Sequence, residues 1–351
     1  MKYRRLGRTG LEVSEVSFGT GDNAGLMTIA PEEHRFSAFE RALEIGVNYF
    51  DTSPDYGKGR AEENLGRALR RFAGAAGRPL YVSTKVEIMA NDFNDIAGAV
   101  VRSTEASLAR LGVESIDVMM IHNPPRHVRD PSVAHWHPLT PDDMLGPALE
   151  GLEKVRAQDK VRWFGFTCEN AEASAVKQVI ASGGYDVINC WYNMVNPTAG
   201  FIMPDGVRYV QGYDNYDGII THAGEHDVGV AVIRPLSGGA LTPQVIEAGA
   251  AGRHRHAGGI YTRKPATFRP EIERGRAFAF LHQESRTLPQ AAYQFALAHP
   301  AVSTIVGGFS DMAQLQEIAR IEALPPLTTD EWARIRAVYD ANFYLDAVAQ
   351  D

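Results

Sequence analysis

The amino-acid sequence predicts an α/β fold in which eight parallel strands close into a barrel with helices between them. Short apolar runs rich in β-branched residues alternate with helix-period stretches along most of the 351 residues, and such alternation is typical of parallel βαβ units. The runs number eight, which favours a closed (β/α)8 barrel over an open sheet. Because the chain length suits one barrel with insertions, we expect residues 1–351 to form a single domain.

The predicted elements follow one another in a regular order. Residues 1–20 are expected to form a β-hairpin, because alternating apolar positions flank a turn at Gly7–Gly10. Glu32–Ile45 and Ala61–Phe72 carry apolar residues at helical spacing, and Thr329–Tyr344 is predicted to add a helix at the carboxyl end. The eight predicted strands are Val16–Phe18, Val47–Phe50, Leu80–Thr84, Ile116–Ile121, Val161–Thr167, Val187–Trp191, Val228–Ile233 and Val302–Val306.

Three long stretches, 123–145, 196–226 and 249–270, do not fit this alternation and are rich in Gly, Pro, His or aromatic residues. They would follow the fourth, sixth and seventh strands, so we expect long loops on the catalytic face of the barrel. The aromatic residues considered as walls of an apolar substrate pocket are Trp136, Trp191, Phe201 and Tyr261. Core packing is an equally good role for Trp191.

Composition excludes several classes of partner. The formal net charge is -8, which argues against a surface that binds nucleic acid. The first twenty residues lack an apolar targeting segment, and no run approaches the ~20 apolar residues of a membrane span; we expect a cytoplasmic protein. The two cysteines, Cys168 and Cys190, have no metal-binding spacing and are expected to be reduced, buried thiols.

Four ionisable residues occur at or just past the ends of three successive predicted strands. They are Asp51, Tyr56, Lys85 and His122. The carboxyl ends of barrel strands converge on one face, so these side chains should surround one small cavity. Each residue alone is more often structural, and their joint position indicates a proton-transfer site.

These residue types suit the polarisation and protonation of a carbonyl group. A free tyrosine has a pKa near ~10, so Tyr56 needs a neighbouring cation such as Lys85 in order to act as an acid. Asp51 can hold that ammonium in place, and neutral His122 can donate a hydrogen bond to a carbonyl oxygen. None of the four can supply electrons, so a reductase would need a bound hydride donor.

Several segments resemble the aldo-keto reductase superfamily. The central match is VNYFDTSPDYG at 47–57, followed by EENLG at 62–66, STK at 83–85 and MIH at 120–122. Further similar segments appear in order along nearly the whole chain: YRRLGRTGL at 3–11, VRWFGFT at 161–167, WYN at 191–193, RPLSGG at 234–239 and IVGG at 305–308. The resemblance implies a TIM barrel that binds an extended nicotinamide dinucleotide. It also implies that Tyr56 is the acid/base, tuned by Lys85 and Asp51, and that His122 orients a small carbonyl substrate.

The resemblance also implies a set of cofactor-binding residues at the strand ends. Thr167 or Cys168 and Asn189 occupy the positions that hold the nicotinamide carboxamide, where relatives more often carry Ser-Asn and Gln. Ile233 stands where an aromatic residue usually stacks on the nicotinamide ring. The full set is Gly19, Thr20, Thr167, Cys168, Asn189, Arg234, Leu236, Ser237, Gly239, Gly308, Phe309, Ser310, Gln314 and Glu317, in which Leu236, Ser237 and Gly239 would offer backbone donors to the pyrophosphate.

The stretch after the eighth strand departs from the pattern of members that prefer NADP. Those members commonly grip the adenosine 2′-phosphate with basic residues, whereas this chain has Gly308–Asp311 and then Gln314. Asp311 would repel a phosphate if it pointed inward. Arg263, Lys264 or Arg269 could supply a replacement charge. On the habit of the superfamily we expect NADP, with NAD as the second possibility.

Other interpretations stay open at this level. A barrel glycoside hydrolase could use Asp51, Glu87 and Glu169 as acid and base, and a nucleotide-binding regulatory subunit would resemble the potassium-channel β subunits. Residues Gly19–Gly25 look like a loose dinucleotide fingerprint, but the glycine spacing does not fit a Rossmann turn. The histidines His127, His135, His137, His226, His254 and His256 lack a convincing ligand partner, so no metal is expected. The oligomeric state is left open.

Overall fold

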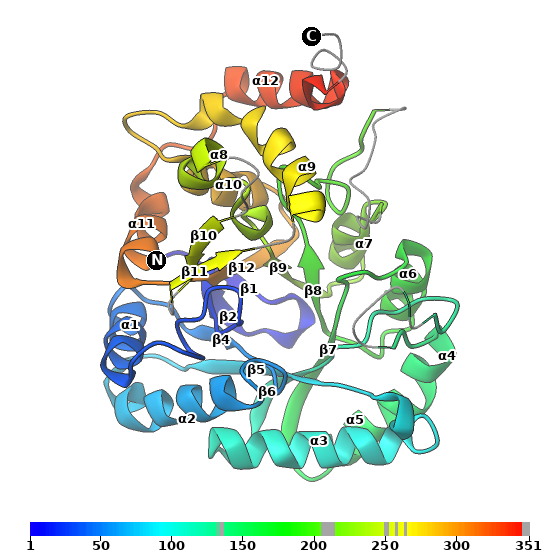
Figure 1. The fold of residues 1–351 in the computed structure, drawn as a ribbon. Coiled ribbons are helices and arrows are strands. Elements are labelled where there is room, and N and C mark those ends of the chain that lie inside the picture. Colours follow the sequence, from blue (N-terminus) through cyan, green and yellow to red (C-terminus); the bar gives the residue numbers. More distant parts are fainter. Residues whose placement is uncertain are drawn as a thin grey trace.

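The structure, a computed structural model, describes residues 1–130, 132, 137–204, 215–248, 253–256, 259–262 and 265–345. Eight parallel strands close into a barrel in the order β12-β3-β4-β5-β6-β7-β8-β9, which confirms the predicted fold (Figure 1). Their bounds are β3 (Val16–Gly19), β4 (Tyr49–Asp51), β5 (Tyr81–Val86), β6 (Ile116–Ile121), β7 (Val161–Thr167), β8 (Val187–Trp191), β9 (Gly229–Ile233) and β12 (Val302–Gly308).

Helices cover the outside of the barrel because each turns an apolar stripe toward the strands. The helix α2, for example, buries Leu65, Ala68 and Leu69 against the core and leaves its charged residues exposed, except for Glu62, which is buried and accepts from the Thr84 hydroxyl. The helices are α1 (Glu32–Glu44), α2 (Arg60–Phe72), α3 (Ile96–Leu111), α4 (Pro141–Asp143), α5 (Leu149–Arg156), α6 (Ala173–Ala181), α7 (Ile219–Glu225), α8 (Pro243–Ala248), α9 (Pro265–Arg276), α10 (Leu288–Leu297), α11 (Met312–Ala319) and α12 (Thr329–Asp340). None of those in the described part of the chain is long and apolar enough to cross a membrane.

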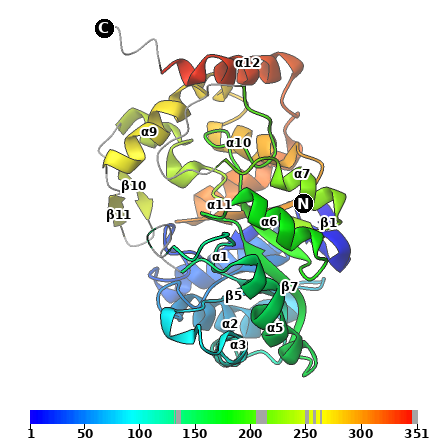
Figure 2. The ribbon, with the colours of Figure 1, turned by 90° about the vertical axis from the view of Figure 1, so that its right-hand side faces the viewer.

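The amino-terminal hairpin closes one end of the barrel. It consists of β1 (Tyr3–Arg5) and β2 (Glu12–Ser14) and confirms the predicted hairpin. Leu6, Leu11 and Val13 from this segment are buried in one apolar cluster with side chains of β4, β6 and β8. Figure 2 shows β1 on the opposite side of the barrel from β10 and β11, so the hairpin leaves the other end available for a site.

The predicted long loops are partly wrong, because each stretch contains regular structure. Stretch 249–270 contains β10 (Arg253–His256) and β11 (Gly259–Thr262), which pair antiparallel, and the start of α9. Stretch 196–226 ends in α7, and stretch 123–145 contains α4. These short elements were not predicted because the composition of the three stretches is typical of loops. The carboxyl-terminal helix is confirmed, but α12 ends at Asp340 rather than at Tyr344.

Candidate active site

A cavity of about 850 Å³ opens at the carboxyl ends of the barrel strands. Asp51 ends β4, Lys85 lies within β5, and His122 follows β6 directly. The loop after β4 brings Tyr56 to the same place, and all four predicted catalytic residues line the cavity. The structure therefore brings together the residues that strand-end convergence predicted to meet.

Lys85 and Asp51 form a buried ion pair at the base of this cavity. Lys85 Nζ donates to Asp51 Oδ1 at 2.7 Å and to the backbone oxygen of Thr52 at 2.7 Å. Burial alone would lower the pKa of Lys85, but Asp51 and Tyr56 outweigh it and the pKa is raised. The ammonium is therefore held charged in a site from which water is largely excluded.

Tyr56 lies beside this ion pair with a protonated phenol. Lys85 Nζ is 5.0 Å from the centre of the Tyr56 ring. Burial raises the pKa of Tyr56 to about 12, and the Lys85 ammonium acts in the opposite direction. Without that cation the phenol would be a still weaker acid, which makes Lys85 the residue that can ease proton transfer from Tyr56.

His122 contacts Tyr56 on one side and Glu87 on the other. The Tyr56 and His122 rings meet edge to face with their centres 6.3 Å apart. His122 Nδ1 lies 3.0 Å from Glu87 Oε1. Burial and the positive charge of Lys85 lower the pKa of His122 to about 3, so the imidazole is neutral near pH 7.

Asn189 provides the clearest test of whether the cavity fits a nicotinamide cofactor. Its Nδ2 donates to Asp51 Oδ2 at 3.1 Å, and its side chain is completely buried at the cavity wall. Asn189 Oδ1 has no hydrogen-bond partner among the described residues. A buried acceptor without a donor is costly, and the N–H groups of a carboxamide would satisfy it. The residues present therefore fit the group that the family resemblance implies.

The segment after β9 forms one wall of the cavity. Arg234 donates to Glu169 Oε1 at 2.8 Å and lies over the Trp191 ring at 4.8 Å from its centre. Arg234 and Ser237 both have positive φ, so the chain turns sharply here. The Ser237 and Gly239 N–H groups already donate to backbone oxygens of Arg234 and Leu236. Two of the backbone N–H groups that were expected to donate to the pyrophosphate are therefore already hydrogen-bonded within the turn.

The opposite end of the cavity is formed by α10, α11 and the segment before α11, and it is acidic. Asp311 caps α11 by accepting from the N–H of Gln314 at 3.0 Å. Glu317 accepts from the Thr287 hydroxyl at 2.6 Å. Lys85 and Arg234 are the only Lys or Arg residues among the described lining, and each is paired with a carboxylate. Arg269 is exposed and does not line the cavity, while 263–264 lie outside the described residues.

Most of the predicted cofactor residues line the same cavity as the catalytic four. Those that do are Gly19, Thr167, Asn189, Arg234, Leu236, Gly239, Gly308, Phe309, Ser310, Gln314 and Glu317. Three do not: Thr20 donates to the backbone of Asp51, Cys168 is a buried free thiol, and Ser237 bonds Glu271. Of the four aromatic residues considered for the substrate pocket, Phe201 packs on Tyr339 and Trp191 lies beneath Arg234. The side chains of the other two lie outside the described residues.

Sequence reasoning missed the partner of His122. Glu87 entered only as a candidate hydrolase acid, yet it bonds His122 and the Ser53 hydroxyl. The other two candidate hydrolase carboxylates form ion pairs, Asp51 with Lys85 and Glu169 with Arg234. The spacing of Lys85 and Glu87 could have indicated that Glu87 faces the site. Side chains two residues apart along an extended segment lie on the same side of it.

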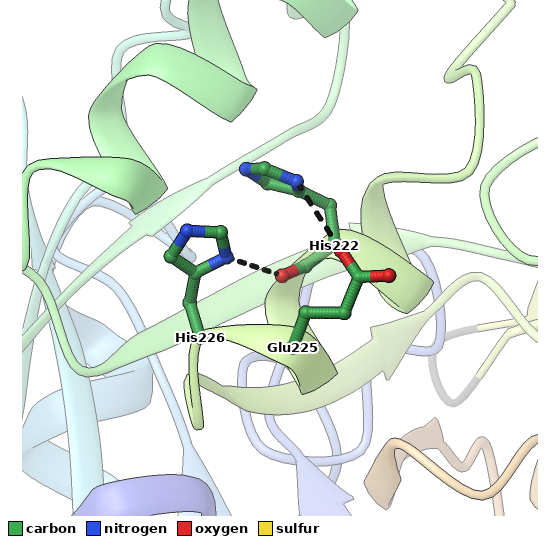
Figure 3. Close-up of side chains that lie close together, drawn as sticks. All are labelled: His222, Glu225 and His226. Carbon is green, nitrogen blue, oxygen red and sulfur yellow. Dashed lines mark hydrogen bonds and ion pairs between the residues drawn. The ribbon is translucent and has the colours of Figure 1, made fainter.

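Three potential metal ligands lie together in the described part of the chain, His222, Glu225 and His226 (Figure 3). They belong to α7 and its carboxyl cap, just before β9 begins, and none of them lines the active-site cavity. His226 Nδ1 bonds the backbone oxygen of His222 at 2.9 Å. This bond orients the His226 ring and leaves its Nε2 available. Two histidines and one carboxylate at a helix end are by themselves no metal site, and we assign none.

A closed barrel with ionisable groups gathered at the carboxyl ends of its strands defines an enzyme scaffold. The model of the Aldo/keto reductase family matches residues 15–340. The chain belongs to this family and is an oxidoreductase; members of the family use nicotinamide cofactors.

Known relatives agree with this assignment. The chain is 27% identical over 337 residues to an L-galactose dehydrogenase from Arabidopsis thaliana, covering 94% of this chain and 91% of that one. It is 26% identical to a probable voltage-gated potassium channel subunit beta from the same plant, covering 93% of each. The holo form of aldo-keto reductase AKR11C1 from Bacillus halodurans superposes with a TM-score of 0.70 at 21% identity, over 97% of this chain and 96% of that one. This structural match supports the fold.

Proposed function

We propose that the protein transfers hydride between a nicotinamide dinucleotide and a small aldehyde or ketone, or the corresponding alcohol in reverse. The observation that carries this proposal is the buried Asp51–Lys85 pair beside Tyr56 at the carboxyl ends of the strands. An ion pair in such a place costs desolvation energy, and the Lys85 ammonium acts on the Tyr56 phenol, which lines the same cavity. That arrangement serves proton transfer.

In the reductive direction Tyr56 donates its proton to the substrate oxygen. A nicotinamide cofactor held in this cavity would supply the hydride that the carbonyl carbon accepts. Lys85 stabilises the phenolate that Tyr56 becomes, and Asp51 keeps the ammonium in place through Oδ1 while Asn189 holds Oδ2. His122 lies against Tyr56 and orients the substrate. In the oxidative direction the same groups work in reverse order.

The residues proposed to hold the cofactor lie along the cavity wall from β7 to α11. Asn189 Oδ1 would accept from the carboxamide, and Thr167 lies beside it across the β7–β8 pair. Gly19, Gly239 and Gly308 let the backbone approach the cofactor closely. The adenosine would lie toward Gln314 and Glu317.

The acidic end of the cavity favours NAD over NADP. Asp311 caps α11 with a negative charge, and a 2′-phosphate near it would be repelled. Lys85 and Arg234, the Lys and Arg residues of the described lining, are paired with Asp51 and Glu169. From the family resemblance we expected NADP first and NAD second, and this proposal reverses that preference. Separate titrations with NADH and NADPH test it.

The substrate is proposed to be a sugar-like alcohol or its carbonyl product. The support is the 27% identity to a protein named L-galactose dehydrogenase over nearly the full length of both chains. The similarity to a channel β subunit keeps a regulatory role as a second candidate. The buried proton-transfer set favours catalysis, because a binding subunit has no need of it.

The experiment is turnover with a panel of aldoses, polyols and simple aldehydes, followed through the absorbance of the reduced cofactor. We expect turnover that depends strictly on added nucleotide. Glycoside cleavage without nucleotide would support the hydrolase instead. Tight nucleotide binding with no turnover on the whole panel would favour the regulatory role.

A further inference from the structure

Glu62, in the first turn of α2, is a buried carboxylate that links three elements of the fold. Its side chain is completely buried. Glu62 Oε1 accepts from the Thr84 hydroxyl of β5 at 2.6 Å, and Oε2 accepts from Arg110 Nε of α3 at 2.5 Å. The helices α2 and α3 lie side by side on the outside of the barrel (Figure 1). This one carboxylate therefore links both helices to a barrel strand.

The ion pair with Arg110 allows a carboxylate to be buried in this place. A buried charge is costly unless it is paired and hydrogen-bonded, and both oxygens of Glu62 have a donor. Arg110 is oriented by a bond from its Nη2 to the Ser107 hydroxyl at 3.2 Å. Its side chain lies against Gly59, the N-cap of α2, where an added Cβ would come within 2.8 Å of Arg110 Cδ. The start of α2 is therefore packed around this ion pair.

On the strand side, the residue linked to Glu62 is the neighbour of Lys85. Thr84 directly precedes Lys85 in β5. Adjacent side chains of a strand point to opposite faces, so Lys85 reaches the cavity while Thr84 reaches Glu62 in the helix layer. The bond to Glu62 thus holds the part of β5 that carries the ammonium.

On the helix side, Tyr56 is joined to α2 by a short turn. The backbone oxygen of Tyr56 accepts from the N–H of Ala61, the second residue of α2, at 3.2 Å. The turn between them, 57–59, has three consecutive residues with positive φ, so the chain reverses sharply before the helix begins. Tyr56 therefore follows the position of α2.

We propose that Glu62 is a positioning residue that sets the distance between the Tyr56 phenol and the Lys85 ammonium. The inference rests on the proposed function, because it gives Glu62 a part in the same proton transfer. Glu62 is not among the described residues that line the cavity, and it acts through Thr84 and the start of α2. Lys85 Nζ lies 5.0 Å from the centre of the Tyr56 ring. Since the effect of a charge falls with distance, a small displacement of α2 from β5 weakens the effect of the ammonium on the phenol.

The variant Thr84→Val tests the proposal because it removes the hydroxyl and keeps the size of the side chain. Glu62 Oε1 then loses its donor on β5, while the ion pair with Arg110 remains. Thr84→Ser keeps the hydroxyl and is the conservative variant. Thr104→Val is the matched control, because it removes a completely buried hydroxyl of α3 that donates to the backbone oxygen of Val100. Thr84→Ala, which also lacks the hydroxyl, replaces Thr84→Val if the larger side chain prevents folding.

The first readout is the ¹⁹F NMR spectrum of the full chain labelled with 3-fluorotyrosine, which requires no turnover. The chain has 13 tyrosines, and Tyr56→Phe identifies the relevant signal by its loss. We expect Thr84→Val to shift or broaden the Tyr56 signal, and Thr84→Ser and Thr104→Val to leave it where it is in the wild type. An unchanged Tyr56 signal in Thr84→Val, or an equal change in Thr104→Val, would overturn the proposal.

The second readout is the rate of alcohol oxidation as a function of pH. In this direction Tyr56 is the base, so the rate rises as the phenol loses its proton. We expect Thr84→Val to lower kcat about tenfold, as a small misplacement of a reacting group allows, while KM stays within about twofold. The rise in rate should also move to higher pH, because the ammonium that lowers the pKa of Tyr56 acts from farther away.

A purely structural role for Glu62 predicts a different result. Thr84→Val would then lose stability but keep the kcat and the pH profile of Thr104→Val, and this outcome contradicts the proposal. Recovery of the wild-type kcat and pH profile in Thr84→Ser supports it. No turnover of any substrate by the wild type would contradict the proposed function, and the NMR result would still decide whether Glu62 positions Tyr56.

Discussion

Both ends of the barrel contain buried side chains, but these are apolar at one end and charged at the other. At the amino-terminal end the hairpin places Leu6, Leu11 and Val13 in an apolar cluster with side chains of the strands. At the carboxyl-terminal end Lys85 and Asp51 are buried to 2% exposure. The first end contributes hydrophobic stabilisation, whereas the second contains charges that cost desolvation energy. One end of the barrel therefore stabilises the fold, and the other end is arranged for function.

The largest effect should come from removing the proton donor at the carboxyl-terminal end. Tyr56→Phe should lower kcat by about 10³-fold, the range of a lost general acid. Nucleotide affinity and stability should stay near those of the wild type, because only one hydroxyl is removed. Steady-state kinetics and a nucleotide titration measure the two quantities. Activity within tenfold of the wild type would contradict the role given to Tyr56.

The opposite pattern is expected at the amino-terminal end. Leu6 is fully buried against Gly229, so Leu6→Ala should lower the free energy of unfolding by about 2–5 kcal/mol. The kcat of the folded protein should stay within about twofold, since the hairpin is remote from the cavity. Urea unfolding and kinetics on the same sample test this. A large loss of kcat without a loss of stability would contradict a purely stabilising role for the amino-terminal end.

The buried imidazole should make stability depend on pH. Because the pKa of His122 is lowered to about 3, the unfolded chain binds a proton there between pH 6.5 and 3 and the folded chain does not. Stability from this group is complete above pH 6.5 and is lost as pH falls, by at most about 1.4 kcal/mol per pH unit. Unfolding of wild type and His122→Asn between pH 7 and 5 should show a weaker pH dependence in the variant. Equal slopes would mean that His122 is protonated in the folded state.

A smaller effect is expected at the far end of the cavity. Asp311→Asn keeps the cap of α11 and removes its charge, so NADPH should bind about fivefold more tightly through the loss of ~1 kcal/mol of repulsion. NADH affinity should change less than twofold. Asp330→Asn, which changes an exposed residue of α12, is the control. An equal gain for both nucleotides would place Asp311 away from the 2′-position.

The barrel could be predicted because its strands are short apolar runs with a strong local pattern. The four residues around the proton-transfer site could also be predicted to meet, because the carboxyl ends of the strands converge in any such barrel. The hairpin of β10 and β11 was missed, because the segment Arg253–His256 has no apolar residue that would create an alternating pattern. Lys85 was placed at the end of its strand, while β5 continues to Val86.

Partners across the site were harder to predict than the residues themselves. Glu87, Glu169 and Asn189 each acquire their partner from another strand or loop. Local spacing can place a side chain on one side of its own segment, as for Glu87 two residues after Lys85. It does not show which residue of another strand that side chain meets. Glu87 therefore looked like a candidate acid for hydrolysis, and only the fold shows that its carboxylate is directed at His122.

The most direct test of whether this cavity binds a nicotinamide dinucleotide is a titration of the purified protein with NADH and, separately, NADPH, followed by quenching of tryptophan fluorescence. We expect saturable binding with NADH bound more tightly, and a weaker complex in Asn189→Leu, which removes the acceptor for the carboxamide. Binding of neither nucleotide would contradict the assignment of this cavity as a nicotinamide site.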